Sequence, residues 1–335
     1  MNRIKTTCCF CFFSPLLLLA QTDIPAPKNI YQNEISLVTE NDNYTFQGRD
    51  GYYTNGIYLK WNRAVATENI KWFRNKPGIK KVVNGYELGQ AIYNPVSYNR
   101  PLPAFQDRPF AGYLAFSFHQ HVFYQNNSVL QWAASLGAIG PNSFGKNVQR
   151  WYHNVIGIYD VKGWPFQVNN ELSLNVKVAY YKSLLPTLPQ QSLFNIDGFA
   201  KANLGNALTD FTLGTTVKIG WVENLWNSSH YKARVSTANE NKPIRKHEIY
   251  FYYEPAITLQ AYNAVLQGGL FLQNKGPLTV AIKPIVFSQQ FGLRYAQNRV
   301  TTALVYTNRT RQATTQQRNE NFCSIQVGYR FGNVK

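Results

Sequence analysis

Three short segments of this chain group side chains whose types and spacing could do chemistry. The first contains Asn41 and Asp42 and, beyond a turn-like stretch, Thr54. If Asn41 and Asp42 end one strand and Thr54 begins the next, a hairpin brings their amide, carboxylate and hydroxyl oxygens together. Such oxygens suit a hard cation such as Ca²⁺, but the same residue types are also ordinary turn formers. The segment therefore predicts either a cation site with Asn41 and Asp42 as metal ligands or a plain turn.

The second segment, residues 140–153, contains a histidine in a stretch without strand-like alternation. Ser143 is placed to cap a short helix from about residue 144 to residue 155. On that helix Gln149 and His153 are four residues apart and share a face. A histidine on a loop helix can act as a general base, although a lone histidine is more often structural. By its position His153 is the best candidate base among the five histidines of the chain.

The third segment is residues 107–112, in which Arg108 follows Asp107. A guanidinium group can hold a phosphate through two hydrogen bonds at once. It can equally form a structural ion pair with a carboxylate at the rim of the fold. Both interpretations of Arg108 remain open on the sequence.

The elements that must position these segments show a period of two. In residues 170–180, for example, Leu172, Leu174 and Val176 alternate with polar side chains, as in a strand with one apolar face. Charged residues are only 15% of the chain, against about 25% in soluble domains. The alternation predicts twelve strands, at 33–41, 52–64, 82–93, 112–124, 129–139, 169–182, 194–204, 210–221, 246–260, 280–296, 299–308 and 322–331.

Strand length decides between the two β architectures. Many of these segments have nine to fourteen residues, whereas a tilted membrane-spanning strand needs about nine to eleven and a globular strand averages about five to six. We therefore expect an all-β transmembrane antiparallel up-and-down barrel with a short helix in an outer loop. An even strand count places both termini at one end and the loops 42–51, 94–111 and 140–168 at the other. The segment 222–245 is long for an inner turn, so the count could differ by two.

The first residues have the pattern of an export signal. Residues 1–21 contain two early cations, an apolar stretch and Ala20-Gln21, which predicts a cleaved signal peptide followed by one barrel domain at 22–335. The alternative is an anchor helix, which Pro15 would kink. Only Cys323 lies beyond this signal, so the mature chain can form no internal disulfide. The net charge is +17, yet no basic cluster with interleaved aromatics occurs beyond residues 71–81, so we expect no nucleic-acid partner.

Taken together, these segments resemble the family of outer-membrane lipid A 3′-O-deacylases. The likeness follows the same order over nearly the whole mature chain. Its matching pieces are Asn41-Asp42, Tyr53-Thr54-Asn55-Gly56, Asp107-Arg108-Pro109-Phe110-Ala111-Gly112, Gly140-Pro141 with Ser143, Gln149 with His153, Gly163-Trp164, Asn170-Glu171, Gly205-Asn206 and Gly328-Tyr329-Arg330-Phe331.

The resemblance implies a Ca²⁺-dependent hydrolysis that removes an acyloxyacyl chain from lipid A at the outer leaflet. It implies that His153 is the base that deprotonates a water, that Asn41, Asp42 and Thr54 surround the cation and the oxyanion, and that Arg108 binds a lipid A phosphate. The family also has an acidic residue shortly after its histidine. Position 159 is a tyrosine here, which leaves Asp160 or Glu171 for that role.

Two other functions remain open on the sequence. An outer-membrane phospholipase or deacylase with a serine nucleophile needs a serine beside His153, and Ser143 is the nearest candidate; Ser143 and Gln149 are otherwise expected to contact the substrate. A pore or structural barrel without chemistry needs no site at all, because side chains can fill a lumen of this size. We expect a monomer in the outer-membrane bilayer with lipopolysaccharide as its partner.

Overall fold

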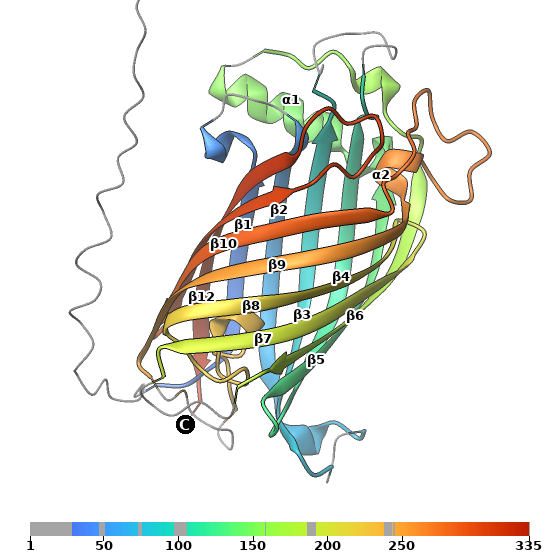
Figure 1. Cartoon of the computed structure of the whole chain (residues 1–335). Helices are drawn as coiled ribbons and strands as arrows, with labels where there is room; N and C mark the ends of the chain where they lie inside the picture. Colours follow the sequence, from blue (N-terminus) through green and yellow to red (C-terminus); the bar gives the residue numbers. More distant parts are fainter. Residues whose placement is uncertain are drawn as a thin grey trace, which may run out of the picture.

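The chain folds into a closed antiparallel barrel (Figure 1). The computed structural model describes residues 29–46, 51–72, 76–96, 106–157, 159–185, 192–237, 243 and 245–334. Within them twelve strands pair with their sequence neighbours, and β1 closes the ring on β12. The predicted fold class and strand count are confirmed. The predicted signal segment, 1–21, lies outside the described residues.

The strand bounds agree with the predicted ones to within three residues, with one exception. The strands are β1 Tyr31–Asn41, β2 Tyr52–Val65, β3 Ile79–Asn94, β4 Ala111–Tyr124, β5 Ser128–Ile139, β6 Glu171–Ser183, β7 Phe194–Gly205, β8 Leu208–Trp221, β9 His247–Asn263, β10 Ile285–Gln297, β11 Val300–Arg309 and β12 Glu320–Asn333. The exception is β10, which was expected from residue 280. Residues 280–284 instead hydrogen-bond irregularly, with Val280 N donating to the Leu266 carbonyl.

The two faces of the wall differ as the alternation predicts. On β6 the side chains of Leu172, Leu174 and Val176 point outward and are largely exposed, whereas Ser173 is buried on the inner face. An apolar outer face is typical of a barrel wall that contacts lipid. Among the described residues, no α-helix has both the length and the apolar character needed to cross a bilayer.

Both described chain ends lie at one end of the barrel, where Val334 N donates to the Ile30 carbonyl at 3.0 Å. The helix α1, Gly145–Ile156, lies at the opposite end, which we call the α1 end (Figure 1). The predicted placement of the termini at one end and of the 140–168 loop at the other is confirmed.

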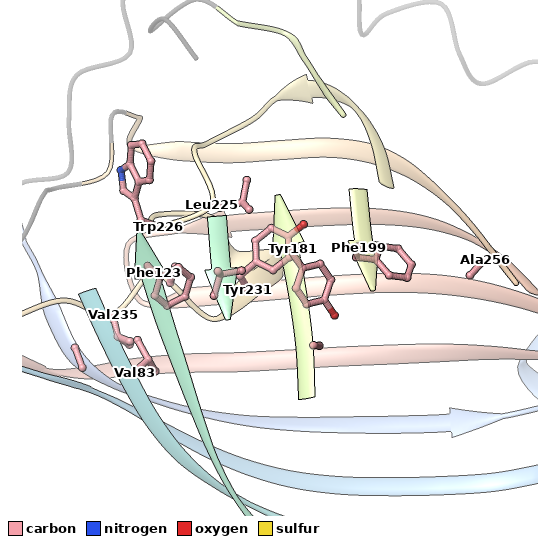
Figure 2. Close-up of a cluster of buried hydrophobic side chains, with 13 residues drawn as sticks. Val83, Phe123, Tyr181, Phe199, Leu225, Trp226, Tyr231, Val235 and Ala256 are labelled. Carbon is pink, nitrogen blue, oxygen red and sulfur yellow. The ribbon is translucent and has the colours of Figure 1, made fainter. Parts of the chain in front are cut away.

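The segment between β8 and β9, which is long for an inner turn, is explained by its position inside the barrel. Residues 222–237, which we call the plug, fold back into the lumen at the end that holds the termini (Figure 1), where their side chains pack on the wall (Figure 2). The apolar side chains of the plug pack against inward-facing side chains of the wall. The buried cluster contains Leu225, Trp226, Tyr231, Ala233 and Val235 of the plug with Ala64, Val83, Phe123, Val129, Ala179, Tyr181, Phe199 and Ala256 of the strands.

Polar contacts tie the plug to three parts of the wall. Lys81 Nζ donates to the Ala233 carbonyl at 2.8 Å, and the Tyr231 hydroxyl donates to Asp197 at 2.7 Å. The Ser228 hydroxyl donates to Glu248, also at 2.7 Å. Because buried polar groups are costly without partners, these contacts make the plug a fixed part of the barrel.

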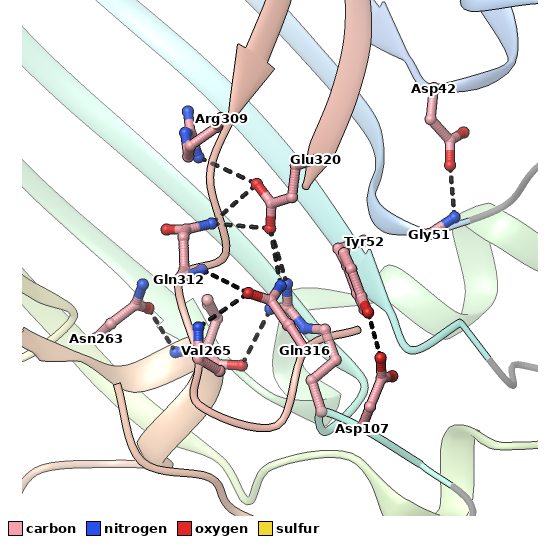
Figure 3. Close-up of polar contacts among 12 residues, drawn as sticks. Asp42, Gly51, Tyr52, Asp107, Asn263, Val265, Arg309, Gln312, Gln316 and Glu320 are labelled. Carbon is pink, nitrogen blue, oxygen red and sulfur yellow. Dashed lines mark hydrogen bonds and ion pairs between the residues drawn. The ribbon is translucent and has the colours of Figure 1, made fainter. Parts of the chain in front are cut away.

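The α1 end of the lumen is covered as well. The short helix α2, Ala264–Gln267, and the loop 310–319 cross this end, and the buried carboxylate of Glu320 accepts hydrogen bonds from Gln312 and Gln316 beneath them (Figure 3). The described residues therefore cover the lumen at both ends, which argues against the pore interpretation.

Candidate functional site

The helix α1 begins one residue later than predicted. A 3₁₀ turn at Pro141–Ser143 precedes it, and the N-cap is Phe144, whose backbone is left-handed at φ 57°. The prediction that Ser143 is the cap of the helix is wrong, because the N-cap is Phe144. The Ser143 hydroxyl donates to the Gly140 carbonyl at 2.6 Å and accepts only a long hydrogen bond, 3.4 Å, from Gly145 N. The helix ends at Ile156, and its C-cap Gly157, with a left-handed backbone (φ 72°), donates its N–H to the His153 carbonyl. This C-cap places His153 in the last turn.

Two glycines let α1 lie close to the barrel wall. A Cβ atom on Gly112 of β4 would lie 2.1 Å from the Ser143 hydroxyl oxygen and 3.1 Å from the Gly145 Cα. Beside this contact, Phe110 and Trp164 pack with ring centroids 5.2 Å apart. Together with Ile92, Val148 and Val161 they form a small apolar cluster under the helix.

The strand register puts the first predicted segment on the outer face of the wall. Asn41 shares its parity with Leu37, whose side chain is 44% exposed on the outer face, yet Asn41 is only 4% exposed. On β2 a bulge between Tyr53 and Asn55 adds Thr54 to the strand. Tyr53 consequently keeps its hydroxyl on Glu40 inside the lumen, while Thr54 joins the outer face. The candidate site therefore lies between α1 and the outside of the wall, not inside the barrel.

A pocket of about 150 Å³ lies at this place. It brings together five of the predicted residues, from β1 and the turn after it, from β2 and from α1: Asn41, Asp42, Thr54, Gln149 and His153. The rest of its lining is mixed, with apolar side chains that include Ile57 of the outer wall and Trp151 of α1, and with polar residues that include Thr39 and Asn43. The pocket thus joins polar groups to apolar side chains of the outer face of β2.

His153 is 5% exposed and its ring is held from one side. Its Nδ1 lies 2.8 Å from the Tyr159 carbonyl oxygen, and the Tyr159 ring meets the imidazole edge-on at 5.3 Å. A carbonyl oxygen can only accept a hydrogen bond, so Nδ1 carries the proton and Nε2 has the lone pair. That tautomer is the one that a general base needs at Nε2.

Gln149 is oriented by a neighbour that the sequence did not single out as a site residue. Trp164 Nε1 donates to Gln149 Oε1 at 2.8 Å, which fixes the amide so that its NH₂ group is a donor. Gln149 Nε2 and Thr54 Oγ1 are buried and have no hydrogen-bond partner within the described ranges. A buried polar atom without a partner is costly and often marks a ligand contact.

The oxygen donors beside these groups fit a hard cation. The Asp42 carboxylate accepts a hydrogen bond from Gly51 N at 2.5 Å (Figure 3), and Asn41 Oδ1 accepts one from Asn43 N at 2.7 Å. The Asp42 carboxylate, the Asn41 amide oxygen and the Thr54 hydroxyl are hard oxygen ligands of the kind that Ca²⁺ takes, and together they carry one negative charge. No cluster of three or more His, Cys, Asp or Glu side chains occurs in the described part of the chain.

Comparison with known proteins decides the family. A family model described as "Outer membrane protein LpxR" matches residues 6–331. The chain belongs to the LpxR family. The structure of LpxR from Salmonella typhimurium matches 89% of this chain and 100% of its own, at a TM-score of 0.69 and 18% identity, which confirms the fold. Two other outer-membrane structures are less similar. The translocator domain of the autotransporter NalP from Neisseria meningitidis matches 91% of each chain at a TM-score of 0.44 and 7% identity. The KdgM porin matches 89% of this chain and 99% of its own at a TM-score of 0.39 and 9% identity. No curated protein sequence matches the chain.

As an LpxR family member the chain is an outer-membrane barrel. Arg108 does not line the pocket beside α1. The Arg108 side chain is fully buried at the α1 end of the lumen, with Nη1 3.4 Å from Glu320 and the guanidinium 4.9 Å from the Tyr93 ring centroid. Burial lowers the pKa of the guanidinium, and Glu320 opposes this shift. The geometry favours the structural ion pair over phosphate binding.

Ser143 and the two candidate acids also do not line the pocket beside α1. Asp160 pairs with the exposed Arg150 at 3.3 Å, and Glu171 accepts hydrogen bonds from Asn206 and from Phe271 N. The Tyr159 main-chain carbonyl hydrogen-bonds the His153 ring, in the stretch of sequence where the resemblance implies an acidic residue. The hydroxyl of Ser143 is bound to a main-chain carbonyl, which disfavours a serine nucleophile.

Proposed function

We propose that this barrel hydrolyses an ester bond of lipid A, removing the 3′-O-linked acyloxyacyl chain, with His153 as the base and water as the nucleophile. The observation that carries the proposal is the position of the pocket. It holds a buried imidazole, an amide donor and a carboxylate on the outer face of the wall, beside apolar side chains that continue the lipid-facing surface. An ester between a polar headgroup and an acyl chain matches that boundary.

The residues divide the reaction between them. His153 Nε2 takes a proton from water as the oxygen attacks the ester carbonyl, and returns that proton to the leaving alcohol. The carbonyl oxygen then bears negative charge. The Gln149 NH₂ group and the Thr54 hydroxyl are donors that can hold it, and Trp164 keeps the amide turned the right way. The Tyr159 carbonyl stabilises the imidazolium that forms.

Asn41, Asp42 and Thr54 are the residues that would hold Ca²⁺ in this scheme. When bound, the ion supplies positive charge that polarises the ester carbonyl. The Gly51 N–H orients the Asp42 carboxylate whether or not a metal is present. Lipid A carries phosphates, and the net charge of +17 on the chain favours an anionic headgroup.

The test uses protein purified in detergent, lipid A with an intact 3′-acyloxyacyl chain, and mass spectrometry of the lipid. We expect the mass to fall by one acyloxyacyl group with Ca²⁺ present and to stay unchanged with EDTA. The Asp42→Asn variant should need a higher Ca²⁺ concentration for half-maximal rate. Asn154→Ala, which changes an exposed residue of the same helix, serves as the matched control. Intact lipid A after incubation with wild-type protein would contradict the proposal.

A further inference from the structure

A second cavity system lies inside the barrel, apart from the pocket beside α1. Its larger part has a volume of about 670 Å³ and borders plug residues His230, Tyr231 and Lys232. A part of about 530 Å³ overlaps with it and reaches Val265 beneath the α1-end cover. We call the larger part the lumen chamber. Its lining contains none of the five pocket residues, so the proposed hydrolysis does not use it.

Positive charge exceeds negative charge in the lumen chamber. Six cationic side chains line it, against three carboxylates. Two of the cations have carboxylate partners within it: Lys60 lies 2.6 Å from Glu87, and Lys201 lies 3.3 Å from Glu254. Apart from these two ion pairs, four cationic side chains and one carboxylate line the lumen chamber.

Three of these cations have no ion-pair partner among the described residues: Lys177 on β6, Lys232 in the plug and Arg294 on β10. Lys232 has a left-handed backbone (φ 63°) directly after the turn Ser229–Tyr231. This conformation is unfavourable for a residue with a Cβ atom. The plug thus adopts a costly backbone at the residue whose ammonium faces the lumen chamber.

Buried donors without acceptors face the same space. Arg294 Nε, Gln326 Nε2 and Asn62 Nδ2 have no hydrogen-bond acceptor in the part of the chain that the structure describes, and all three side chains are more than nine-tenths buried. Gln326 is oriented because its Oε1 accepts from Arg294 Nη1 at 3.3 Å. Asn62 Oδ1 lies 2.9 Å from His119 Nε2, which donates to it in the tautomer that carries its proton at Nε2. A guanidinium can only donate, so the Arg294 contact fixes the Gln326 amide with its NH₂ group as a donor.

We propose that the lumen chamber binds a small multivalent oxyanion, such as inorganic phosphate, through Lys232, Arg294 and Gln326. Unpaired cations together with oriented N–H donors are the chemistry that recognises tetrahedral oxyanions. Lys232 belongs to the plug, whereas Arg294 and Gln326 belong to β10 and β12. The anion therefore bridges the plug and the wall, and its binding stabilises the closed barrel.

The test measures phosphate binding to the full chain in a lipopolysaccharide-free, non-ionic detergent at constant ionic strength. Calorimetric titration gives the Kd, and thermal unfolding gives the shift in Tm. We expect saturable binding to wild-type protein with a rise in Tm. In Lys232→Gln the Kd should rise about tenfold, the effect of losing one charge-assisted hydrogen bond. Lys71→Gln, which changes an exposed lysine of the β2–β3 turn, should behave as wild type.

Two further arms keep the proposal testable. Gln326→Leu removes a donor of the proposed site from a strand instead of the plug, so it tests the same site if circular dichroism shows that Lys232→Gln folds poorly. Its Kd for phosphate should also rise. Short-chain phosphatidic acid in mixed micelles tests whether the phosphate of a lipid headgroup is the ligand, and we expect no competition with phosphate. Competition, the same Kd in wild type and both lumen variants, or no saturable binding would each overturn the proposal.

Discussion

The Nδ1 atom of His153 lies 2.8 Å from the main-chain carbonyl oxygen of Tyr159. This hydrogen bond fixes the imidazole tautomer without a carboxylate, because a carbonyl accepts but never donates. Residue 159 can therefore be a tyrosine at the place where the resemblance led us to expect an acid. In the proposed mechanism the imidazole needs the main-chain carbonyl of residue 159 and not its side chain.

The first prediction concerns the tryptophan that orients Gln149. Trp164→Phe keeps most of the packing on Phe110 but removes the N–H donor to Gln149 Oε1. The amide is then free to turn, and we expect the rate to fall about tenfold with the fold intact, since one neutral hydrogen bond is lost. Rates of lipid A hydrolysis measure the effect. Trp72→Phe, at a position 80% exposed, is the control. An unchanged rate in Trp164→Phe would show that hydrolysis does not depend on the hydrogen bond from Trp164 to Gln149.

The second prediction concerns the close contact between α1 and β4. In Gly112→Ala the new Cβ atom would meet the Ser143 hydroxyl oxygen at 2.1 Å, so the start of α1 must shift. We expect activity to be lost while the barrel still shows the heat-modifiable mobility of a folded outer-membrane protein on gels. Gly198→Ala is the matched control, because its Cβ atom finds ordinary contact distances of 3.4 Å or more. Full activity in Gly112→Ala would contradict the predicted dependence on helix position.

The third prediction separates the two interpretations of Arg108. Arg108→Met leaves Glu320 buried with weaker compensation, and removing one partner of a buried ion pair costs about 3 kcal/mol. Urea unfolding in detergent, followed by tryptophan fluorescence, measures the loss, with Arg63→Met as an exposed-arginine control. We expect an unchanged KM for lipid A. A raised KM with unchanged stability would show instead that Arg108 binds a substrate phosphate.

The fourth prediction concerns conduction through the lumen. Wild-type protein in planar bilayers should show no stable channels, because the plug packs against Phe123 and Tyr181 and is hydrogen-bonded to Asp197. Replacing residues 224–235 by a short Gly-Ser turn uncovers only one end of the lumen, because α2 and the loop 310–319 still cover the other. Steady conductance should therefore appear only when the loop 310–319 is shortened as well. Shortening the exposed turn at residues 67–72 should leave the wild-type behaviour unchanged. Stable channels formed by the wild-type protein would support the pore interpretation.

Much of the barrel could be predicted from the sequence, because period-two alternation is a local signal that each strand carries by itself. The alternation of Leu172 and Ser173 predicts the face of each side chain from this strand alone. The plug carries no such period. Its Leu225 and Tyr231 find their partners only once the ring has closed, so the sequence showed an overlong turn and no more.

The site was predictable in part for the same reason. Asn41, Asp42, Gln149 and His153 are side chains in recognisable spacings, and the structure brings them together with Thr54. The main-chain groups of Tyr159 and Gly51 leave no trace in residue types. The β2 bulge that turns Thr54 outward depends on pairing with β3 and so is not a property of one strand.

The role of His153 is tested most directly with lipid A from bacteria that produce the wild-type chain, His153→Ala or Asn154→Ala. The three samples must contain equal amounts of folded protein in the outer membrane. General-base catalysis contributes about 10²–10⁴-fold, so the mass spectra should show acyl-chain loss with wild type and Asn154→Ala and unmodified lipid A with His153→Ala. Equal acyl-chain loss with His153→Ala would show that hydrolysis does not depend on this imidazole and would contradict the mechanism proposed for the pocket.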